Sequence, residues 1–382
     1  MRVLITSNPG LGHVHPMVPL AQALAHRGHE VRWAVAAEAC GRVEAAGFEA
    51  FPAGITGAER RAEFDRCLAE ASSLPPAKRP DSVFPAFFGA VCTPPMVKDL
   101  LPVIDSWQPA LIVNDASELA APIAAQLRGL PHLTHAFGAL LPEQRIAAAA
   151  ASVAPIWRAN GLGTRPYAGS YDHPYLDIYP PSMRFGSYDH VSQVQALRPV
   201  PFDAGMGDPV NPVRAGDRPL VYLTFGTVFN DPSLFAEAMS GVARLDVDVL
   251  VTVGPVADPV ALGAVPPNVR VERYVPQTAV LPFCAVVVSH AGSGTFLASV
   301  GLGKPQLCLP QAADQFINAG QGAAAGAALT LAPGEASADA IAAALGRLLH
   351  EPAFAEAAGR ISDEIAAMPG PDDVAEVLEG LV

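Results

Sequence analysis

The sequence predicts an α/β protein of two doubly wound domains, each with a parallel β-sheet covered by helices, which face a central cleft. Three observations support this fold class. Short apolar runs alternate with segments of helical periodicity in both halves of the chain. The chain has 382 residues, of which 51% are hydrophobic, and is therefore long for a single core. A run rich in Gly, Pro and Asp at 204–212 is typical of a linker between domains.

The N-terminal domain, residues 1–204, should begin with a regular alternation of strands and helices. Pro16 is well placed in the first turn of a helix that ends at Gly28. Residues 53–100 lose the alternation and should mix a helix rich in Arg and Glu with the Pro-rich patch Leu74-Pro75-Pro76. Residues 140–200 carry many prolines and should form an irregular segment. The expected elements are strands at 3–7, 30–36, 48–51, 110–114 and 132–136, and helices at 16–28, 37–46 and 119–127.

The second domain, residues 219–367, should follow a linker at 205–218 and repeat the α/β pattern. Met368-Pro369-Gly370-Pro371 breaks the last long helix, and we expect the C-terminal segment 368–382 to form a short helix that packs back on the N-terminal domain. The expected elements are strands at 220–225, 247–253, 269–272, 285–288, 306–309 and 328–331, and helices at 232–244, 296–302, 314–325, 338–349 and 353–367.

Composition excludes several classes of protein. The formal net charge of −13 and the lack of a basic cluster argue against a nucleic-acid partner. The five cysteines are widely spaced and form no C-x-x-C pair, so neither disulfides nor a zinc site is expected. No signal segment precedes the first strand, and no apolar stretch has the length and character of a membrane span. We therefore expect a cytoplasmic protein without a membrane partner.

The first strand leads into Gly10-Leu11-Gly12-His13, which resembles the start of a dinucleotide-binding fingerprint. The third glycine of that fingerprint falls at His15, so binding of a nicotinamide cofactor is disfavoured. The turn instead delivers His13 to the carboxyl end of a strand, where it can serve as a general base. Asp115 follows another strand of the same domain and is our candidate for its orienting partner. A structural loop histidine and a helix-capping aspartate are the alternative.

In the second domain the run Ser289 to Thr295 joins a buried strand to a helix. Such a turn favours phosphate, because its glycines admit a ligand close to the backbone and the helix start presents unpaired N–H groups. The candidates for phosphate contacts are His290, Gly292, Ser293, Gly294 and Thr295.

Other strand ends supply further candidates. Gly226 and Thr227 end one strand, and Asp314 and Gln315 open a helix where a carboxylate and an amide suit sugar hydroxyls. Capping of that helix is the ordinary role of Asp314. Ligand-facing aromatic residues are expected from the irregular segments, although packing in a core is the more frequent role. The candidates for acceptor contacts are Phe84, Phe87, Phe88 and Phe137.

Four separate motifs resemble the donor signature of family 1 glycosyltransferases of the GT-B fold. They are Pro267-Asn268-Val269-Arg270-Val271-Glu272-Arg273-Tyr274-Val275-Pro276-Gln277, then Leu281-Pro282, then His290 to Thr295, then Pro310 to Gln315. With Gly10-x-Gly12-His13-x-x-Pro16 the resemblance covers essentially the whole chain. The segments 196–202 and 367–371 are similar to those of bacterial antibiotic glycosyltransferases of the calicheamicin type.

The resemblance implies a role for each candidate. His13 would be the general base and Asp115 its partner, while His290 and the Gly292–Thr295 turn would hold the donor diphosphate. Gly226, Thr227, Val275 and Gln277 would meet the base and ribose, and Asp314 and Gln315 the sugar. Tyr274 stands where many relatives have Trp, so altered stacking on the base is expected.

The implied reaction is an inverting, metal-independent transfer of a deoxysugar from a TDP- or UDP-sugar to a lipophilic natural-product acceptor. TDP is favoured, the sugar nucleotide is a co-substrate, and no further cofactor or metal is expected. The sequence leaves a homodimer open. A nucleotide-sugar 2-epimerase of the same fold and a non-catalytic small-molecule binder remain as alternatives.

Overall fold

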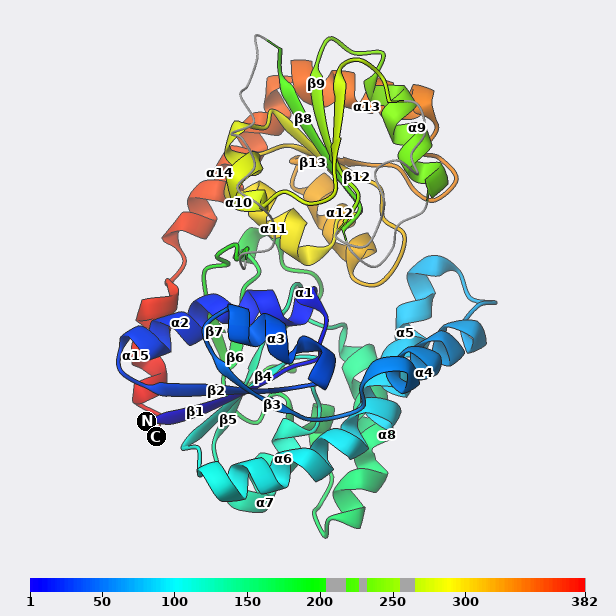
Figure 1. Cartoon of the computed structure of the whole chain (residues 1–382). Coiled ribbons are helices and arrows are strands. Elements are labelled where there is room, and N and C mark those ends of the chain that lie inside the picture. Colours follow the sequence, from blue (N-terminus) through cyan, green and yellow to red (C-terminus); the bar gives the residue numbers. More distant parts are fainter. Residues whose placement is uncertain (204–217, 227–231, 255–264, 382) are drawn as a thin grey trace. The chain divides into compact units, whose positions relative to one another are not determined.

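The computed structural model describes residues 1–203, 218–226, 232–254 and 265–381 (Figure 1). The chain forms two compact units. The first comprises Met1–Tyr179, Gly186–Arg198 and Pro369–Val382, and the second comprises Pro180–Phe185 and Pro199–Met368. Both units are α/β with parallel sheets, as expected. The expected linker falls almost entirely outside the described residues.

The sheet of the first unit has seven strands in the order β3-β2-β1-β4-β5-β6-β7, with every pair parallel. Strand β1 lies between β2 and β4, where Val3 pairs with Val31 on one side and with Leu111 on the other. Helices cover the sheet, so its central strands are buried along nearly their whole length. The strands are β1 (Arg2–Thr6), β2 (Glu30–Val35), β3 (Glu49–Pro52), β4 (Leu111–Asp115), β5 (His132–His135), β6 (Tyr175–Asp177) and β7 (Val194–Ala196).

The helices of this unit include several that the sequence pattern did not predict. The helices that correspond to expected ones are α2 (Val18–His26), α3 (Ala37–Ala45), α7 (Ala121–Arg128) and the C-terminal α15 (Pro371–Glu379). Helix α4 (Gly57–Glu70) matches the helix rich in Arg and Glu that was expected within 53–100. The stretches expected to be irregular also contain α5 (Arg79–Phe84), the π-helical segment η3 (Pro85–Cys92), α6 (Thr93–Trp107) and α8 (Glu143–Ala159). Strands β6 and β7 were also missed.

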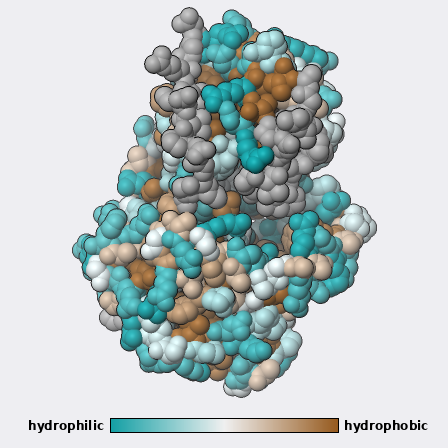
Figure 2. All heavy atoms as spheres, in the orientation of Figure 1, coloured by the Kyte–Doolittle hydropathy of each residue, from teal (hydrophilic) through white to brown (hydrophobic). Residues whose placement is uncertain are grey.

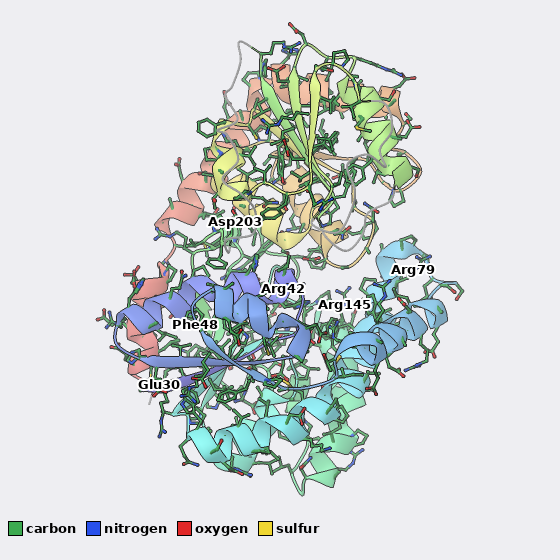
Figure 3. All side chains as sticks on the ribbon, in the orientation of Figure 1. Glu30, Arg42, Phe48, Arg79, Arg145 and Asp203 are labelled. Atoms are coloured by element: carbon green, nitrogen blue, oxygen red, sulfur yellow. The ribbon has the colours of Figure 1, made fainter. Side chains whose placement is uncertain are left out.

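Tertiary packing explains why these helices form despite their prolines. Pro102 and Pro155 lie inside α6 and α8. A Cβ added at Gly89 of η3 would lie 2.1 Å from the Ser152 hydroxyl oxygen, so η3 packs closely against α8. Arg145 of α8, labelled in Figure 3, forms an ion pair of 2.8 Å with Asp81 of α5. The three helical segments are thereby held together.

The helical run Pro76–Trp107 has the length and composition of a membrane span, contrary to the expectation that no stretch does. Its most apolar window is 44% buried inside the protein. Phe87, Leu100 and Ile104 are at most 2% exposed, so this run contributes to the core of the unit. In the view of Figure 2, polar and apolar side chains are interspersed on the described surface of this unit.

The second unit has a six-stranded parallel sheet in the order β10-β9-β8-β11-β12-β13. Its core is formed by Val, Leu, Ile and Phe side chains from the central strands and from α9 and α13. The strands are β8 (Leu220–Thr224), β9 (Asp248–Thr252), β10 (Val269–Glu272), β11 (Val286–Ser289), β12 (Gln306–Cys308) and β13 (Ala328–Thr330). The helices are α9 (Pro232–Val242), α10 (Gln277–Val280), α11 (Ser293–Gly301), α12 (Gln315–Ala324), α13 (Ala338–His350) and α14 (Pro352–Ala367).

Helix α15 belongs to the first unit, although it follows α14 of the second. The Arg27 guanidinium at the end of α2 donates two hydrogen bonds of 2.8 and 2.9 Å to the Glu379 carboxylate of α15. His29 Nε2 lies 2.8 Å from the same carboxylate. The end of the chain is therefore attached to the first unit.

Candidate active site

His13 lies in the short helix α1 (Leu11–Val14), which runs into α2 through the turn η1 (His15–Met17). It was expected in a loop ahead of the helix and instead occupies the first helical turn. Gly10 precedes α1 in an extended conformation, and its carbonyl accepts hydrogen bonds from the His13 and Val14 amides. A Cβ at Gly10 would lie 3.0 Å from Cδ2 of His13, so the glycine gives the imidazole room.

The imidazole of His13 meets the carboxylate at the end of β4. Nδ1 of His13 lies 3.0 Å from Oδ2 of Asp115 and 3.1 Å from the Ser117 hydroxyl oxygen. The Asp115 side chain is fully buried, and that of His13 is 19% exposed. These are the two residues for which the sequence predicted contact.

Ser117 and Asn8 complete this arrangement, and the sequence analysis missed both. The Ser117 hydroxyl donates to Asp115 Oδ2 at 2.8 Å, and its backbone N–H donates to Oδ1 at 3.0 Å. The Asn8 amide donates to the Ser117 hydroxyl at 2.8 Å, and the Asn8 backbone N–H donates to Asp115 Oδ2 at 3.2 Å. Their position at the ends of β1 and β4, beside His13 and Asp115, was the signal that could have identified them.

These contacts keep Asp115 ionised. Burial alone would raise the pKa of its carboxyl group, but the charge and hydrogen bond of His13, with the donors from Ser117, hold that pKa below its ordinary value. A buried carboxylate on Nδ1 leaves Nε2 as the basic nitrogen of the imidazole. This is the pairing that a general base requires.

Two of the four phenylalanines proposed for the acceptor lie against His13. The ring centroids of Phe137 and Phe88 are 4.9 and 5.8 Å from that of His13, and both side chains are partly exposed. Phe87 is 1% exposed and packs edge-on against Phe64, and Phe84 is 6% exposed. Phe84 and Phe87 are therefore core residues. Phe87 and Phe88 are adjacent in η3, but Phe87 is buried and Phe88 is partly exposed, a difference that the sequence analysis did not predict.

In the second unit, the run from Ser289 to Thr295 connects β11 to α11, and Gly292 precedes the helix in an extended conformation. Ala291 adopts a left-handed conformation with φ of 61°. Its carbonyl accepts a hydrogen bond of 2.9 Å from the Asn318 amide of α12. The same amide donates to the Ser293 hydroxyl at 3.0 Å. Asn318, which the sequence analysis did not single out, therefore fixes the turn.

His290 is held between two glycines of this unit. A Cβ at Gly292 would lie 2.4 Å from Nε2 of His290, and a Cβ at Gly226 would lie 2.7 Å from Cε1. Burial lowers the pKa of His290 to about 4, so the imidazole is neutral at pH 7. Nδ1 has no hydrogen-bond partner among the described residues. A neutral imidazole at a turn with free amides suits an anionic oxygen.

Asp314 and Gln315 lie at the start of α12, and their side chains accept hydrogen bonds from neighbouring loops and from Asn318. The Asp314 carboxylate makes no cap on α12; it accepts hydrogen bonds from the Ser293 hydroxyl and from the Asn318 amide at 3.3 Å. Gln315 is 2% exposed, and its Oε1 accepts the backbone N–H groups of Gln311 and Ala312. This oxygen is therefore occupied by two backbone amides, whereas Gln315 was expected to contact the donor sugar. Nε2 of Gln311 is buried without a partner among the described residues and is a further candidate donor.

Of the residues expected near the nucleobase, Val275 lies between β10 and α10, and Gln277 is the first residue of α10. Gln277 Nε2 donates to the Thr295 hydroxyl at 2.8 Å, which links the base region to the phosphate turn. The Val275 side chain is 2% exposed in a core cluster, so only its backbone is available to a ligand. The Tyr274 hydroxyl donates at 3.2 Å to Asp203, labelled in Figure 3. Thr227 lies outside the described residues.

No group of three or more His, Cys, Asp or Glu side chains that could hold a metal ion occurs among the described residues. The pair Asp246 and Asp248 at the start of β9 forms ion pairs with Arg218.

Comparison with known proteins decides the family. Residues 82–212 match the profile of the N-terminal domain, and residues 236–381 that of the C-terminal domain, of the family described as erythromycin biosynthesis protein CIII-like. The chain belongs to this family. Among curated proteins, the chain is similar to the elloramycin glycosyltransferase of Streptomyces olivaceus, which is 33% identical over 98% of this chain and 96% of its own length. The L-demethylnoviosyl transferase of Streptomyces niveus is also 33% identical, over 99% of this chain and 97% of its own length.

Solved structures of this kind share the fold over the whole chain. The spinosyn rhamnosyltransferase SpnG has a TM-score of 0.82 at 27% identity and covers all of both chains. The glycosyltransferase VinC, in complex with dTDP, has a TM-score of 0.81 at 28% identity, with 100% of this chain and 99% of that chain covered. The erythromycin CIII-like chain described here is therefore a glycosyltransferase with the GT-B fold, as the donor motifs indicated.

Proposed function

We propose that the protein transfers a deoxysugar from a TDP-sugar to a hydroxyl group of a lipophilic natural product, with inversion at the anomeric carbon. The names of the relatives support the substrate classes: they include a TDP-daunosamine transferase from Streptomyces peucetius. SpnG has been solved both with thymidine diphosphate and with the spinosyn aglycone.

The observation that carries the proposal is the contact of His13 with the buried carboxylate of Asp115. With Nδ1 held by Asp115 and Ser117, Nε2 takes the proton of the acceptor hydroxyl while that oxygen attacks the anomeric carbon. The bond between the anomeric carbon and the diphosphate oxygen breaks in the same step, and the nucleoside diphosphate leaves. Attack from the face opposite to the leaving group inverts the anomeric configuration.

The leaving diphosphate gains charge as its bond to the sugar breaks. The start of α11 offers unpaired backbone N–H groups at this turn, and the Ser293 and Thr295 hydroxyls are at the same helix end. His290, whose pKa burial lowers to about 4, adds a donor that is uncharged at pH 7. Fixed donors of this kind stabilise charge that develops in a transition state, so we propose a reaction without metal and without a cofactor beyond the sugar nucleotide.

The surroundings of His13 fit an apolar acceptor. Phe88 and Phe137 present partly exposed rings next to the imidazole. We further propose that the enzyme acts in the cytoplasm on small molecules and without a membrane partner. Its net charge of −13 argues against a nucleic-acid partner.

Two linked measurements test this function. TDP should raise the melting temperature of the protein by several degrees more than UDP does, because a tight ligand stabilises the folded state by mass action. TDP-sugar should then release TDP in proportion to an added polyketide or macrolide acceptor and form a glycoside. Equal shifts with both nucleotides would contradict the donor assignment. Conversion of the sugar nucleotide without any acceptor would indicate an epimerase instead.

A further inference from the structure

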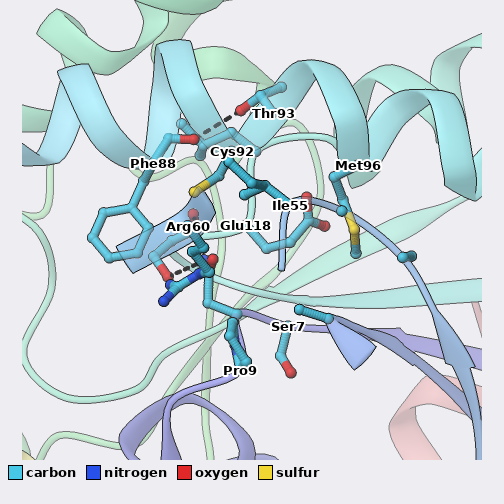
Figure 4. A pocket seen from close by; sticks show the side chains of 15 residues that line it. Ser7, Pro9, Ile55, Arg60, Phe88, Cys92, Thr93, Met96 and Glu118 are labelled. Atoms are coloured by element: carbon cyan, nitrogen blue, oxygen red, sulfur yellow. Dashed lines mark hydrogen bonds between the residues drawn. The ribbon is translucent and has the colours of Figure 1, made fainter. Parts of the chain in front are cut away.

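A hollow of about 320 Å³, counted with the space open to solvent, lies at the ends of β1 and β4 in the first unit. Its walls include Ser7, Arg60, Phe88, Cys92, Ser117 and Glu118 (Figure 4). Two of these residues also contact His13, the proposed general base. The Phe88 ring centroid is 5.8 Å from that of His13, and the Ser117 hydroxyl oxygen is 3.1 Å from His13 Nδ1. A molecule in this hollow is therefore adjacent to the groups that surround His13.

Arg60 brings a positive charge to the wall of the hollow. Its guanidinium lies 5.0 Å from the centroid of the Phe87 ring, which holds the side chain in place. Among the described residues no carboxylate lies within ion-pair distance of Arg60. The other two arginines of α4 are paired: Arg61 with Asp65 at 3.0 Å, and Arg66 with Glu63 and Glu70 at 2.7 Å.

Glu118, which lines the same hollow, and Glu38, whose carboxylate is influenced electrostatically by Arg60, have other hydrogen-bond partners. Glu118 accepts hydrogen bonds from the Thr6 hydroxyl at 2.6 Å and from the Ala120 and Ala121 amides. Burial is the main cause that raises the pKa of Glu118 to about 7, so its negative charge is only partial at neutral pH. Glu38 accepts from the Thr56 hydroxyl and from the Gly57 amide at 3.3 Å. Neither group neutralises Arg60 by direct contact.

We propose that Arg60 binds an ionised oxygen of the acceptor. The acceptor would then be an aromatic natural product that carries a carboxylate or an acidic phenol on the same framework as the hydroxyl that receives the sugar. The planar guanidinium matches two oxygens of a carboxylate, and a charged hydrogen bond is stronger in a partly enclosed site than in water. The aromatic wall at Phe88 suits the ring system of such a molecule. This proposal rests on the proposed function, because it assigns the hollow to the acceptor.

The test compares an acid with its neutral ester. 6-Hydroxy-2-naphthoic acid and its methyl ester serve as probes, and calorimetric titration measures their Kd for the TDP-loaded protein. The parent should bind the acid at least about tenfold more tightly than the ester. Arg60→Met should remove this preference and leave the Kd of the ester within about twofold, since Met retains the length of the apolar stem. Arg60→Lys should retain only part of the preference, because an ammonium lacks the forked geometry.

Arg61→Met is the matched control, because Arg61 lies on the same helix and is 75% exposed in its pair with Asp65. It should bind both probes as the parent does. Melting temperatures within about 2 °C of the parent would show that the variants fold. Equal binding of acid and ester by the parent, no binding of the acid, or an unchanged preference in Arg60→Met would each overturn the proposal. Binding of TDP to the parent is measured in the same titrations. A parent that does not bind TDP would contradict the proposed function itself, whereas a parent that binds TDP but does not prefer the acid would contradict only the role of Arg60.

Discussion

Nδ1 of His13 lies 3.0 Å from Oδ2 of Asp115, in a pair whose carboxylate is fully buried and whose imidazole is 19% exposed. The buried carboxylate of Asp115 orients the imidazole, and the partly exposed imidazole of His13 is available to a substrate. The two residues are distant in the sequence but meet because β1 and β4 are neighbours in the parallel sheet and their carboxyl ends lie together.

Asp115→Asn should lower kcat by about 10²–10⁴-fold and leave the KM for the sugar nucleotide nearly unchanged. The amide of Asn would donate to Nδ1, so the proton of the neutral imidazole would move to Nε2, which could no longer accept one from the acceptor. Steady-state kinetics with saturating donor check this. A kcat within threefold of the parent would show that Asp115 does not orient the base.

Ser117→Ala should reduce kcat by about tenfold with little change in either KM, because Asp115 Oδ2 and the Asn8 amide each lose a partner. Ser117 is a positioning residue, so the acidic limb of the pH profile of kcat/KM should also move. Ser106→Ala is the control, since Ser106 is exposed and its hydroxyl donates to the Val103 carbonyl of the same helix, away from Asp115. A lower melting temperature with an unchanged pH profile would mean that Ser117 is merely structural.

Gly292→Ala should weaken TDP binding about 100-fold, because the new Cβ would lie 2.4 Å from Nε2 of His290 and displace the ring from the phosphate turn. The loss of the TDP-induced rise in melting temperature measures the effect. Gly320→Ala in α12, where a new Cβ meets nothing within 4 Å, should bind TDP as the parent does. Full TDP binding by Gly292→Ala would show that the diphosphate lies elsewhere.

Glu118→Gln should change how stability depends on pH. Burial, with the Asp115 carboxylate, raises the pKa of Glu118 from 4.5 in the unfolded chain to about 7 in the folded protein. The folded state therefore holds this proton more tightly, so the contribution of Glu118 to stability is greatest below pH 4.5 and falls as the pH rises to 7. Gln cannot ionise, so the variant does not lose this contribution to the free energy of unfolding, which amounts to about 3 kcal/mol.

The melting temperatures of parent and Glu118→Gln, taken from pH 4.5 to 8, measure this difference. Their gap should widen in favour of the variant up to about pH 7 and then stay constant. The buried His132, His135 and His290, whose pKa values burial lowers to about 4, have the opposite effect on stability in both proteins and cancel from the comparison. A gap that does not depend on pH would contradict the raised pKa.

The central strands of the parallel sheets were largely predictable, because a strand buried on both faces has a continuous apolar sequence, such as residues 286–288 of β11. The segments around the acceptor hollow were not. Helices α5, η3 and α8 are specified by contacts distant in sequence, such as Gly89 with Ser152 and Arg145 with Asp81, and these leave no local pattern.

The candidate site, too, could be predicted only in part from the sequence. His13 and Asp115 follow strands, and strand ends in a parallel sheet point to a common edge, so their contact could be inferred. The direction of a side chain could not. Gln315 turns its oxygen to the loop amides, and Phe87 turns into the core while Phe88 contacts His13. Ser117 and Asn318 were missed because hydrogen-bond networks depend on tertiary positions.

The central claim is that His13 removes the acceptor proton, and one paired measurement on His13→Ala tests it most directly. TDP-sugar turnover with a polyketide acceptor and TDP binding by thermal shift are recorded on the same preparation. The account predicts that glycoside formation falls by at least about 10²-fold, while the TDP-induced rise in melting temperature stays within about 1 °C of the parent. Glycoside formation at close to the parent rate, with TDP binding intact, would contradict the assignment of His13 as the base.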